Sequence, residues 1–247
     1  MKKSTRYLLI ATSVILFLVS YFVYIFPEHP GFTPLSFLFI IGMALPSYVS
    51  LARWMGKARA SVIISMLSAA AVIVEGIAIV TGFPYGHFSY SGALGYMLLG
   101  LVPWSVAFAY PPILLGSLTA ASHLIESKGW RLITVATLLT VSVDLVLDPA
   151  AVALGFWGWD AGGSYYGVPA VNFIGWLVTG GLYNGMLLFA LRDKIAMGSN
   201  VPIDVSYSLP LILSFWTGFA LWSGMLLPCL VGLALLGLFA HVYMREA

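Results

Sequence analysis

The sequence has 247 residues, of which 61% are hydrophobic and only 8% are charged, with a formal net charge of +2. Soluble globular domains carry roughly 25% charged residues, so this composition excludes an ordinary water-soluble fold and indicates that the chain is surrounded by lipid. The small positive charge does not indicate nucleic-acid binding, and the single cysteine, Cys229, excludes a disulfide framework and a thiolate metal site.

The apolar residues form segments long enough to cross a bilayer, which takes about 20 mostly apolar residues per helix. They predict an all-α fold, a polytopic bundle of about eight transmembrane helices in a single integral membrane domain over residues 1–247. The expected helices lie at about 7–26, 34–52, 61–81, 94–122, 131–148, 170–191, 207–223 and 226–244. The last two are divided near Ser223-Gly224 and Pro228, and an undivided stretch there would leave seven helices.

All eleven Lys and Arg residues fall on one side of the membrane when the chain is threaded alternately through these eight segments. Cytoplasmic loops are enriched in Lys and Arg, so both termini of this multi-pass protein of the cell membrane are predicted to be cytoplasmic. The first segment follows a basic start, as a signal peptide does. However, Phe26-Pro27-Glu28 lacks the small residues of a cleavage site, and this segment is predicted to be retained.

Three acidic residues lie inside the predicted helices, where ionisable groups are costly and indicate either function or a structural hydrogen bond. Glu75 lies near the non-cytoplasmic end of the third helix, and Asp144 and Asp148 lie four residues apart on one face of the fifth. The sixth helix carries a polar and aromatic stripe that begins at the same membrane face: Asn172, Trp176, Thr179 and Tyr183. These groups are therefore predicted to meet on the non-cytoplasmic side.

Two loops on that side are rich in glycine and aromatic residues and contain no Lys or Arg. One spans 82–90 and includes Tyr85; the other runs from Pro149 to Pro169 and includes Trp157, Trp159, Tyr165 and Tyr166. An interfacial aromatic belt accounts for such residues singly, but it does not explain three acids at one depth. In the predicted fourth helix, Pro103-Trp104 and Tyr110-Pro111-Pro112 either shape a pocket or only kink the helix.

The residue inventory excludes several membrane chemistries. Four scattered histidines are too few for a histidine-rich di-iron site, and no glycine-rich dinucleotide motif follows a strand. The spacing of Asp144 and Asp148 resembles the Asp-x-x-x-Asp motif of membrane prenyltransferases, but a diphosphate also needs cations, which this face lacks. Proton chemistry on an apolar molecule remains, because a carboxyl group in low dielectric tends to stay protonated and a neighbouring acid reinforces this. Aromatic faces would stabilise the resulting cation.

Between about residues 70 and 190 these features occur as ordered blocks. They are Glu75 with Thr81 to Gly86, Val102-Pro103-Trp104, Ala109-Tyr110-Pro111, Asp144 to Pro149 with Trp157 and Trp159, Tyr165 to Pro169, and Asn172 to Trp176. The set resembles the membrane carotenoid biosynthesis proteins of the CruF type. Characterised members are carotenoid 1,2-hydratases that act on acyclic or monocyclic ends, including bisanhydrobacterioruberin ends in haloarchaea. The resemblance implies a lyase that adds water, without cofactor or metal, to a terminal isopropylidene double bond and forms a tertiary alcohol.

For this reaction Asp144 is the expected acid, with Asp148 as the alternative if the depth assignment is wrong, and Glu75 is expected to hold the water or accept its proton. A further set is predicted to line the end-group pocket, stabilise the cation or orient the acid and water: Tyr85, Trp104, Trp157, Trp159, Tyr165, Tyr166, Asn172 and Trp176. The expected partners are a carotenoid or related isoprenoid substrate, the lipid bilayer and other enzymes of the carotenoid pathway.

Three alternatives remain open at this point. Capture of the same cation by the substrate's own double bond would make the chain an end-group cyclase. If the chain instead binds a carotenoid or a quinone without turnover, the acids have a structural role. A transporter of protons or small solutes also carries intramembrane acids, although no inverted repeat of broken helices is evident.

Overall fold

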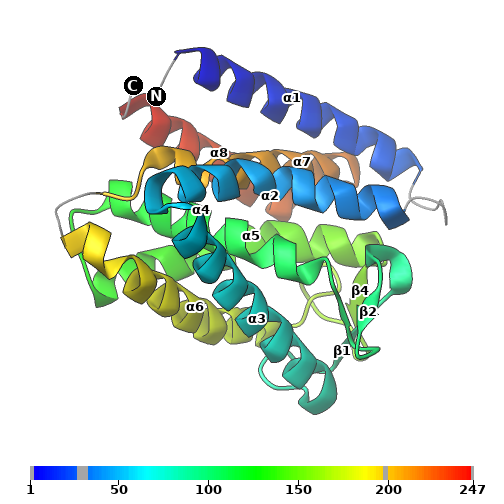
Figure 1. Ribbon diagram of the computed structural model, residues 1–247. Coiled ribbons are helices and arrows are strands. Elements are labelled where there is room, and N and C mark those ends of the chain that lie inside the picture. The colour runs from blue at the N-terminus through cyan, green and yellow to red at the C-terminus, as the bar shows by residue number, and fades with distance from the viewer. Residues whose placement is uncertain (1–2, 27–32, 197–199, 246–247) are drawn as a thin grey trace.

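The computed structural model describes residues 3–26, 33–196 and 200–245, which form eight α-helices and two small β-sheets (Figure 1). The helices are α1 (Lys3–Ile25), α2 (Thr33–Met55), α3 (Lys57–Thr81), α4 (Val106–Leu124), α5 (Trp130–Ala153), α6 (Ala170–Ala196), α7 (Ser208–Trp222) and α8 (Leu226–Arg245). Two 3-10 helices, η2 (Gly92–Leu94) and η3 (Ile203–Ser206), precede α4 and α7. The predicted all-α bundle of about eight helices is confirmed.

Seven of these helices are long and apolar enough to cross a membrane, with η3 counted as part of the seventh span. Within the described residues, α4 is the one helix that is not among them. The alternative of seven helices is wrong for this part of the chain. A turn at Ser223 to Met225 separates α7 from α8, and Gly224 there adopts a φ of +73°, which glycine tolerates without strain.

The fourth helix begins at Val106 instead of at residue 94 as predicted. The preceding segment forms η2 and a hairpin of β2 (Met97–Leu98) with β3 (Val102–Pro103). Its backbone turns through positive φ angles at Gly95, Leu99 and Gly100, which an α-helix does not allow. The prediction was wrong because the segment is apolar enough for a helix, whereas its glycines and Pro103 favour a turn.

Smaller differences concern helix ends. The fifth helix continues for a further turn beyond the predicted end at residue 148, to Ala153, with Pro149 inside it. The third helix begins four residues earlier than expected, at Lys57 after Gly56. Helix ends are the least well determined feature of a hydropathy pattern, since the polar residues of a first turn are indistinguishable from loop.

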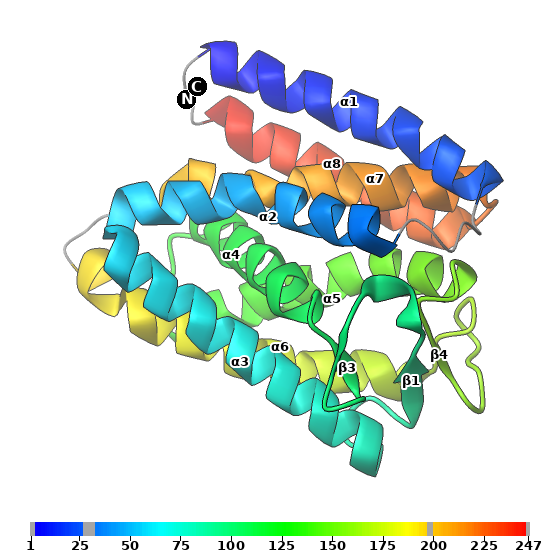
Figure 2. The same ribbon diagram turned by 45° about the vertical axis from the view of Figure 1, so that its right-hand side comes forward.

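Helix α4 lies at the centre of the bundle and packs against α2, α3, α5, α6 and α7. Its middle section is buried on all sides, which its apolar and small residues from Ile113 to Ala121 allow. Helix α1 is the outermost element in both views and packs mainly on α7 (Figure 2).

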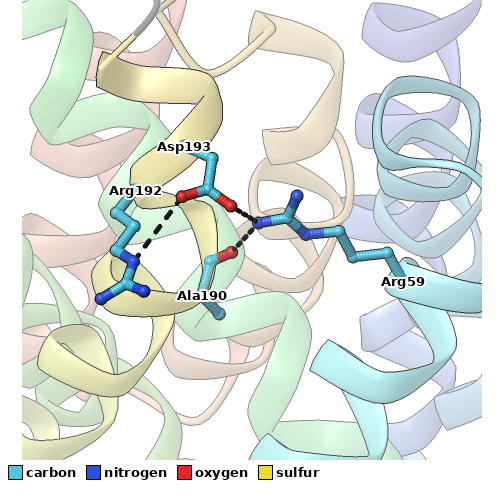
Figure 3. A network of polar contacts seen from close by, with 4 residues as sticks. All are labelled: Arg59, Ala190, Arg192 and Asp193. Atoms are coloured by element: carbon cyan, nitrogen blue, oxygen red, sulfur yellow. Dashed lines mark hydrogen bonds and ion pairs between the residues drawn. The ribbon is translucent and has the colours of Figure 1, made fainter.

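The described basic residues gather at one end of the bundle, where α1, α3 and α5 begin and α2, α6 and α8 end (Figure 1). At this end Arg59 of α3 donates to the Ala190 carbonyl (2.8 Å) and pairs with Asp193 of α6 (3.0 Å), and Arg192 lies 3.6 Å from the same carboxylate (Figure 3). The grouping agrees with the alternating path expected from the sequence. That this end faces the cytoplasm stays a prediction.

The two aromatic loops meet at the opposite end. Strand β1 (Phe88–Tyr90) pairs antiparallel with β4 (Trp157–Trp159), so that Phe88 lies opposite Trp159 and Tyr90 opposite Trp157. This small sheet ties the loop after α3 to the loop after α5 and covers that end of the bundle (Figure 2).

Candidate active site

A cavity of about 1050 Å³ lies under the β1–β4 sheet and is lined by side chains from every helix between α1 and α7. Ligand-binding pockets commonly measure roughly 300–1,000 Å³, so this one is at the upper end of that range. Its lining is mainly aliphatic and aromatic and, within the described residues, includes no Lys, Arg or His. The carboxyl and amide groups of the lining are concentrated in one place, where Glu75, Asp144, Asp148 and Asn172 face the cavity.

Asp144 and Asp148 form a carboxyl pair on α5. One amide nitrogen, Nδ2 of Asn172 on α6, donates to Oδ2 of Asp144 (3.0 Å) and to Oδ2 of Asp148 (2.6 Å). The two carboxyl groups also interact directly with each other, and the Trp157 side chain interacts with Asp148. Two carboxyl groups in contact can share one proton, so the pair is suited to hold a transferable proton away from water.

The second oxygen of Asp144 is different from the other carboxyl oxygens of the site. Asp144 Oδ1 is buried and accepts no hydrogen bond from the described residues. A buried polar atom that lacks a partner is costly and points to a ligand, a water molecule or a proton at that position. Oδ1 is therefore the oxygen of Asp144 at which a proton or a ligand is still needed.

Glu75 on α3 is held by two tyrosines. The Tyr110 hydroxyl of α4 donates to Oε1, and the Tyr90 hydroxyl of β1 donates to Oε2 at 3.1 Å. Burial beside Glu75 raises the pKa of Tyr90 well above its ordinary value, with desolvation as the main cause, so this hydroxyl stays a donor. A carboxyl group with a donor on each oxygen is arranged as a hydrogen-bond acceptor, in contrast to Asp144.

Aromatic rings enclose this polar end. Tyr110 stacks on Trp176 with ring centroids 5.0 Å apart and an interplanar angle of 4°. The rings of Tyr90 and Trp157 meet edge to face at 5.6 Å, and Phe88 and Trp159 are 5.8 Å apart. Their π faces offer negative potential without a nucleophilic atom, which suits a transient carbocation.

Tyr85 lies at the edge of the polar group and is almost completely buried. Its hydroxyl donates to Thr179 Oγ1 (2.9 Å), and its carbonyl accepts from the Trp159 indole N–H (2.8 Å). Burial also raises the pKa of Tyr85 above the ordinary value of tyrosine. Tyr85 therefore links the first aromatic loop to α6 and to β4, and it positions the ring of Trp159.

The structure brings most of the residues predicted from the sequence to the cavity. The three acids line it, and so do five of the eight residues predicted for binding: Tyr85, Trp157, Trp159, Asn172 and Trp176. The polar stripe predicted on the sixth helix also faces inward, since its four residues are all buried.

Three predicted binding residues lie outside the cavity lining. Trp104 stacks on Phe37 with ring centroids 3.9 Å apart, because the hairpin that replaces the first turns of the predicted fourth helix turns it away. Tyr165 donates to the Leu145 carbonyl (3.1 Å), and the Tyr166 hydroxyl accepts from the Leu227 backbone N–H (3.4 Å). Both tyrosines hold the second loop against helices and do not line the cavity.

The sequence-based set omitted Tyr90, Tyr110 and Ser105, which all line the cavity. Tyr110 stood in one of the ordered blocks, and a tyrosine inside an apolar helix signals a buried hydrogen bond. Tyr90 reaches Glu75 only because β1 pairs with β4 across the two loops, and no local sequence pattern predicts that pairing. Ser105 Oγ, at the start of α4, is buried without a hydrogen-bond partner among the described residues.

Gly175 provides a direct test of how this end is packed. A Cβ atom at this position of α6 would lie 2.6 Å from Tyr85 Cδ1 and 2.7 Å from the Pro84 carbonyl oxygen. We expect Gly175→Ala to displace Tyr85 and the first loop, and to lower turnover roughly tenfold or more, because small misplacements of positioning groups are costly. Gly185→Ala on the same helix, with its nearest neighbour at 3.9 Å, is the matched control and should leave turnover unchanged.

Comparison with known proteins identifies a family and a relative that match most of this chain. The family model described as "Carotenoid biosynthesis protein" matches residues 31–239. The chain is 33% identical over 222 residues to a protein of Haloarcula japonica named bisanhydrobacterioruberin hydratase, and the match covers 85% of this chain and 74% of the relative. No solved structure matches the chain.

Proposed function

The chain belongs to the carotenoid biosynthesis protein family, and we propose that it is a carotenoid hydratase that adds water to a terminal C1,2 double bond of an acyclic or monocyclic carotenoid. The name of the Haloarcula japonica relative supports the reaction class. The observation that carries the proposal is a buried carboxyl pair with one unpartnered oxygen, facing a large apolar cavity walled by aromatic rings. The protein itself is a membrane protein, and we propose the cell membrane as its location.

Proton transfer from the carboxyl pair starts the proposed reaction. Asp144 delivers its proton to the CH carbon of the isopropylidene double bond, and the electron pair of that bond forms the new C–H bond. The positive charge then lies on the neighbouring tertiary carbon, next to the faces of Trp157 and Trp176. Asp148 and Asn172 hold Asp144 in place and retain the remaining hydrogen bonds of the pair.

Addition of water completes the proposed reaction. A water molecule attacks the tertiary cation, forming the C–O bond, and the resulting oxonium loses one proton to Glu75. The two tyrosine hydroxyls on Glu75 fix the direction of its carboxyl group. Return of that proton to the carboxyl pair restores the starting state, so the net change is one alkene and one water converted into one tertiary alcohol.

Expression in a lycopene-producing host tests the proposal. We expect products heavier than lycopene by one water for each end that reacts, which mass analysis of the extracted pigments detects. A new carotenoid of unchanged mass would instead indicate an end-group cyclase. Unaltered lycopene in cells that contain the folded protein would contradict turnover of this substrate and favour a binding protein.

A further inference from the structure

The cavity has two unlike ends. At one end the acids and Asn172 are buried, as described above. The other end is an apolar arm between α1 and α2, lined chiefly by Val19, Phe22, Val23, Phe39, Ile40 and Met43. Phe22 lines this arm and is 60% exposed. The arm therefore reaches the lipid-facing surface at α1, whereas the acids lie at its closed end.

The helix packing explains why the cavity opens there. Helix α1 packs mainly on α7, whereas α2 packs on α3, α4 and α7, and the described parts of α1 and α2 have no extensive contact with each other. Both helices nevertheless line the cavity, so helix-to-helix packing does not close it between α1 and α2.

We propose that the opening between α1 and α2 is a lateral entrance, through which one end of a carotenoid passes from the bilayer to the carboxyl pair while its polyene chain lies in the apolar arm. This inference rests on the proposed function for the identity of the chain. The occupant is an apolar isoprenoid, because the arm is lined mainly by aliphatic and aromatic side chains and belongs to the same cavity as the acid end. Entry from lipid also spares the polyene a passage through water, which its apolar surface disfavours.

The arrangement has a consequence for specificity. Only the reacting end and the adjoining part of the polyene meet the protein, and the far end of the molecule stays in the bilayer. Side chains of the arm, above all Val23 on α1 and Ile40 on α2, then determine which carotenoids can bring an end to the acids. A ring at the far end should leave hydration of the open end unaffected.

Filling the arm tests this inference by turnover. Val23→Trp and Ile40→Trp are expected to lower hydration of lycopene roughly tenfold or more, since substrate misplacement by about an ångström costs up to 10²-fold. The matched controls Ile15→Trp on α1 and Leu38→Trp on α2 change exposed side chains that do not line the cavity, and they should retain wild-type turnover. Equal turnover in all four variants would overturn the inference.

A labelling experiment tests occupancy without relying on turnover or on bulky variants. Single cysteines replace Val23 or Ile15 in a Cys229→Ser background, and the protein in liposomes reacts with a lipid-soluble maleimide with and without lycopene. Lycopene should slow labelling at position 23 several-fold and leave position 15 unchanged. The absence of protection at position 23, or equal protection at both positions, would contradict the entrance. Protection at position 23 without any mass gain in the pigment would uphold the entrance and refute the hydratase proposal.

Discussion

Asp144→Asn is expected to lower carotenoid hydration by about 10²–10⁴-fold, the contribution of one positioned general acid. An asparagine keeps the shape of the side chain and can remain beside Asn172, but it has no proton that it can give to an alkene. The geometry singles out Asp144 because its Oδ1 is buried without a hydrogen-bond donor, whereas Asp148 is engaged by Asn172 at 2.6 Å and by Trp157. The measurement is the fraction of water-adducted product at a fixed amount of membrane-inserted protein.

Asp148→Asn is the matched control on the same helix face. It removes one carboxyl group from the pair but leaves the proposed acid, so we expect a loss of roughly tenfold, equivalent to about 1.4 kcal/mol for the altered hydrogen bonding. The reverse ranking, with Asp148→Asn the more damaging change, would transfer the role of acid to Asp148. Full activity of Asp144→Asn would exclude Asp144 as the acid.

The helical bundle could be predicted from sequence because each signal is local. A transmembrane helix is a continuous apolar run, and Lys and Arg mark one side of the membrane whatever the packing. The hydropathy pattern predicted the wrong structure at residues 94–105, where apolar composition favours a helix but the backbone preferences of the residues do not. That segment is apolar throughout most of its length, but Gly95, Gly100 and Pro103 fold it into a hairpin.

The acid end of the site could be predicted for a similar reason. Glu75, Asp144, Asp148 and Asn172 are polar groups inside apolar helices, and the depth of each follows from its distance to a helix end. The residues that the prediction missed or misplaced depend on contacts between distant segments. Tyr90 is brought to Glu75 by pairing of β1 with β4, and Trp104 is carried away by its hairpin. The apolar arm was also unpredictable, because Val23 and Ile40 look like ordinary lipid-facing residues until α1 and α2 are placed in space.

Glu75→Gln is expected to change the product as well as the rate. If Glu75 holds the attacking water and accepts its proton, the variant still forms the cation but no longer captures it efficiently. Hydrated product should fall about 10²-fold, within the range for loss of one general base. The cation should then lose a proton or react with a neighbouring double bond, which gives isomeric carotenoids of unchanged mass. Chromatography with mass analysis separates these compounds from the water adduct.

Tyr110→Phe separates the role of the carboxyl group from that of the ring beside it. The phenylalanine can keep the stack on Trp176, whose planes lie within 4° of parallel, while Glu75 loses the hydrogen bond to Oε1. Loss of one such bond to a charged group is worth roughly 1.5–3 kcal/mol, so hydration should fall by at least about tenfold with the same shift toward products of unchanged mass. A variant that lost rate but made only water adducts would show that Tyr110 acts through packing alone.

Wild-type product and rate in Glu75→Gln would remove Glu75 from the chemistry and leave the carboxyl pair on α5 as both the donor and the acceptor of the proton.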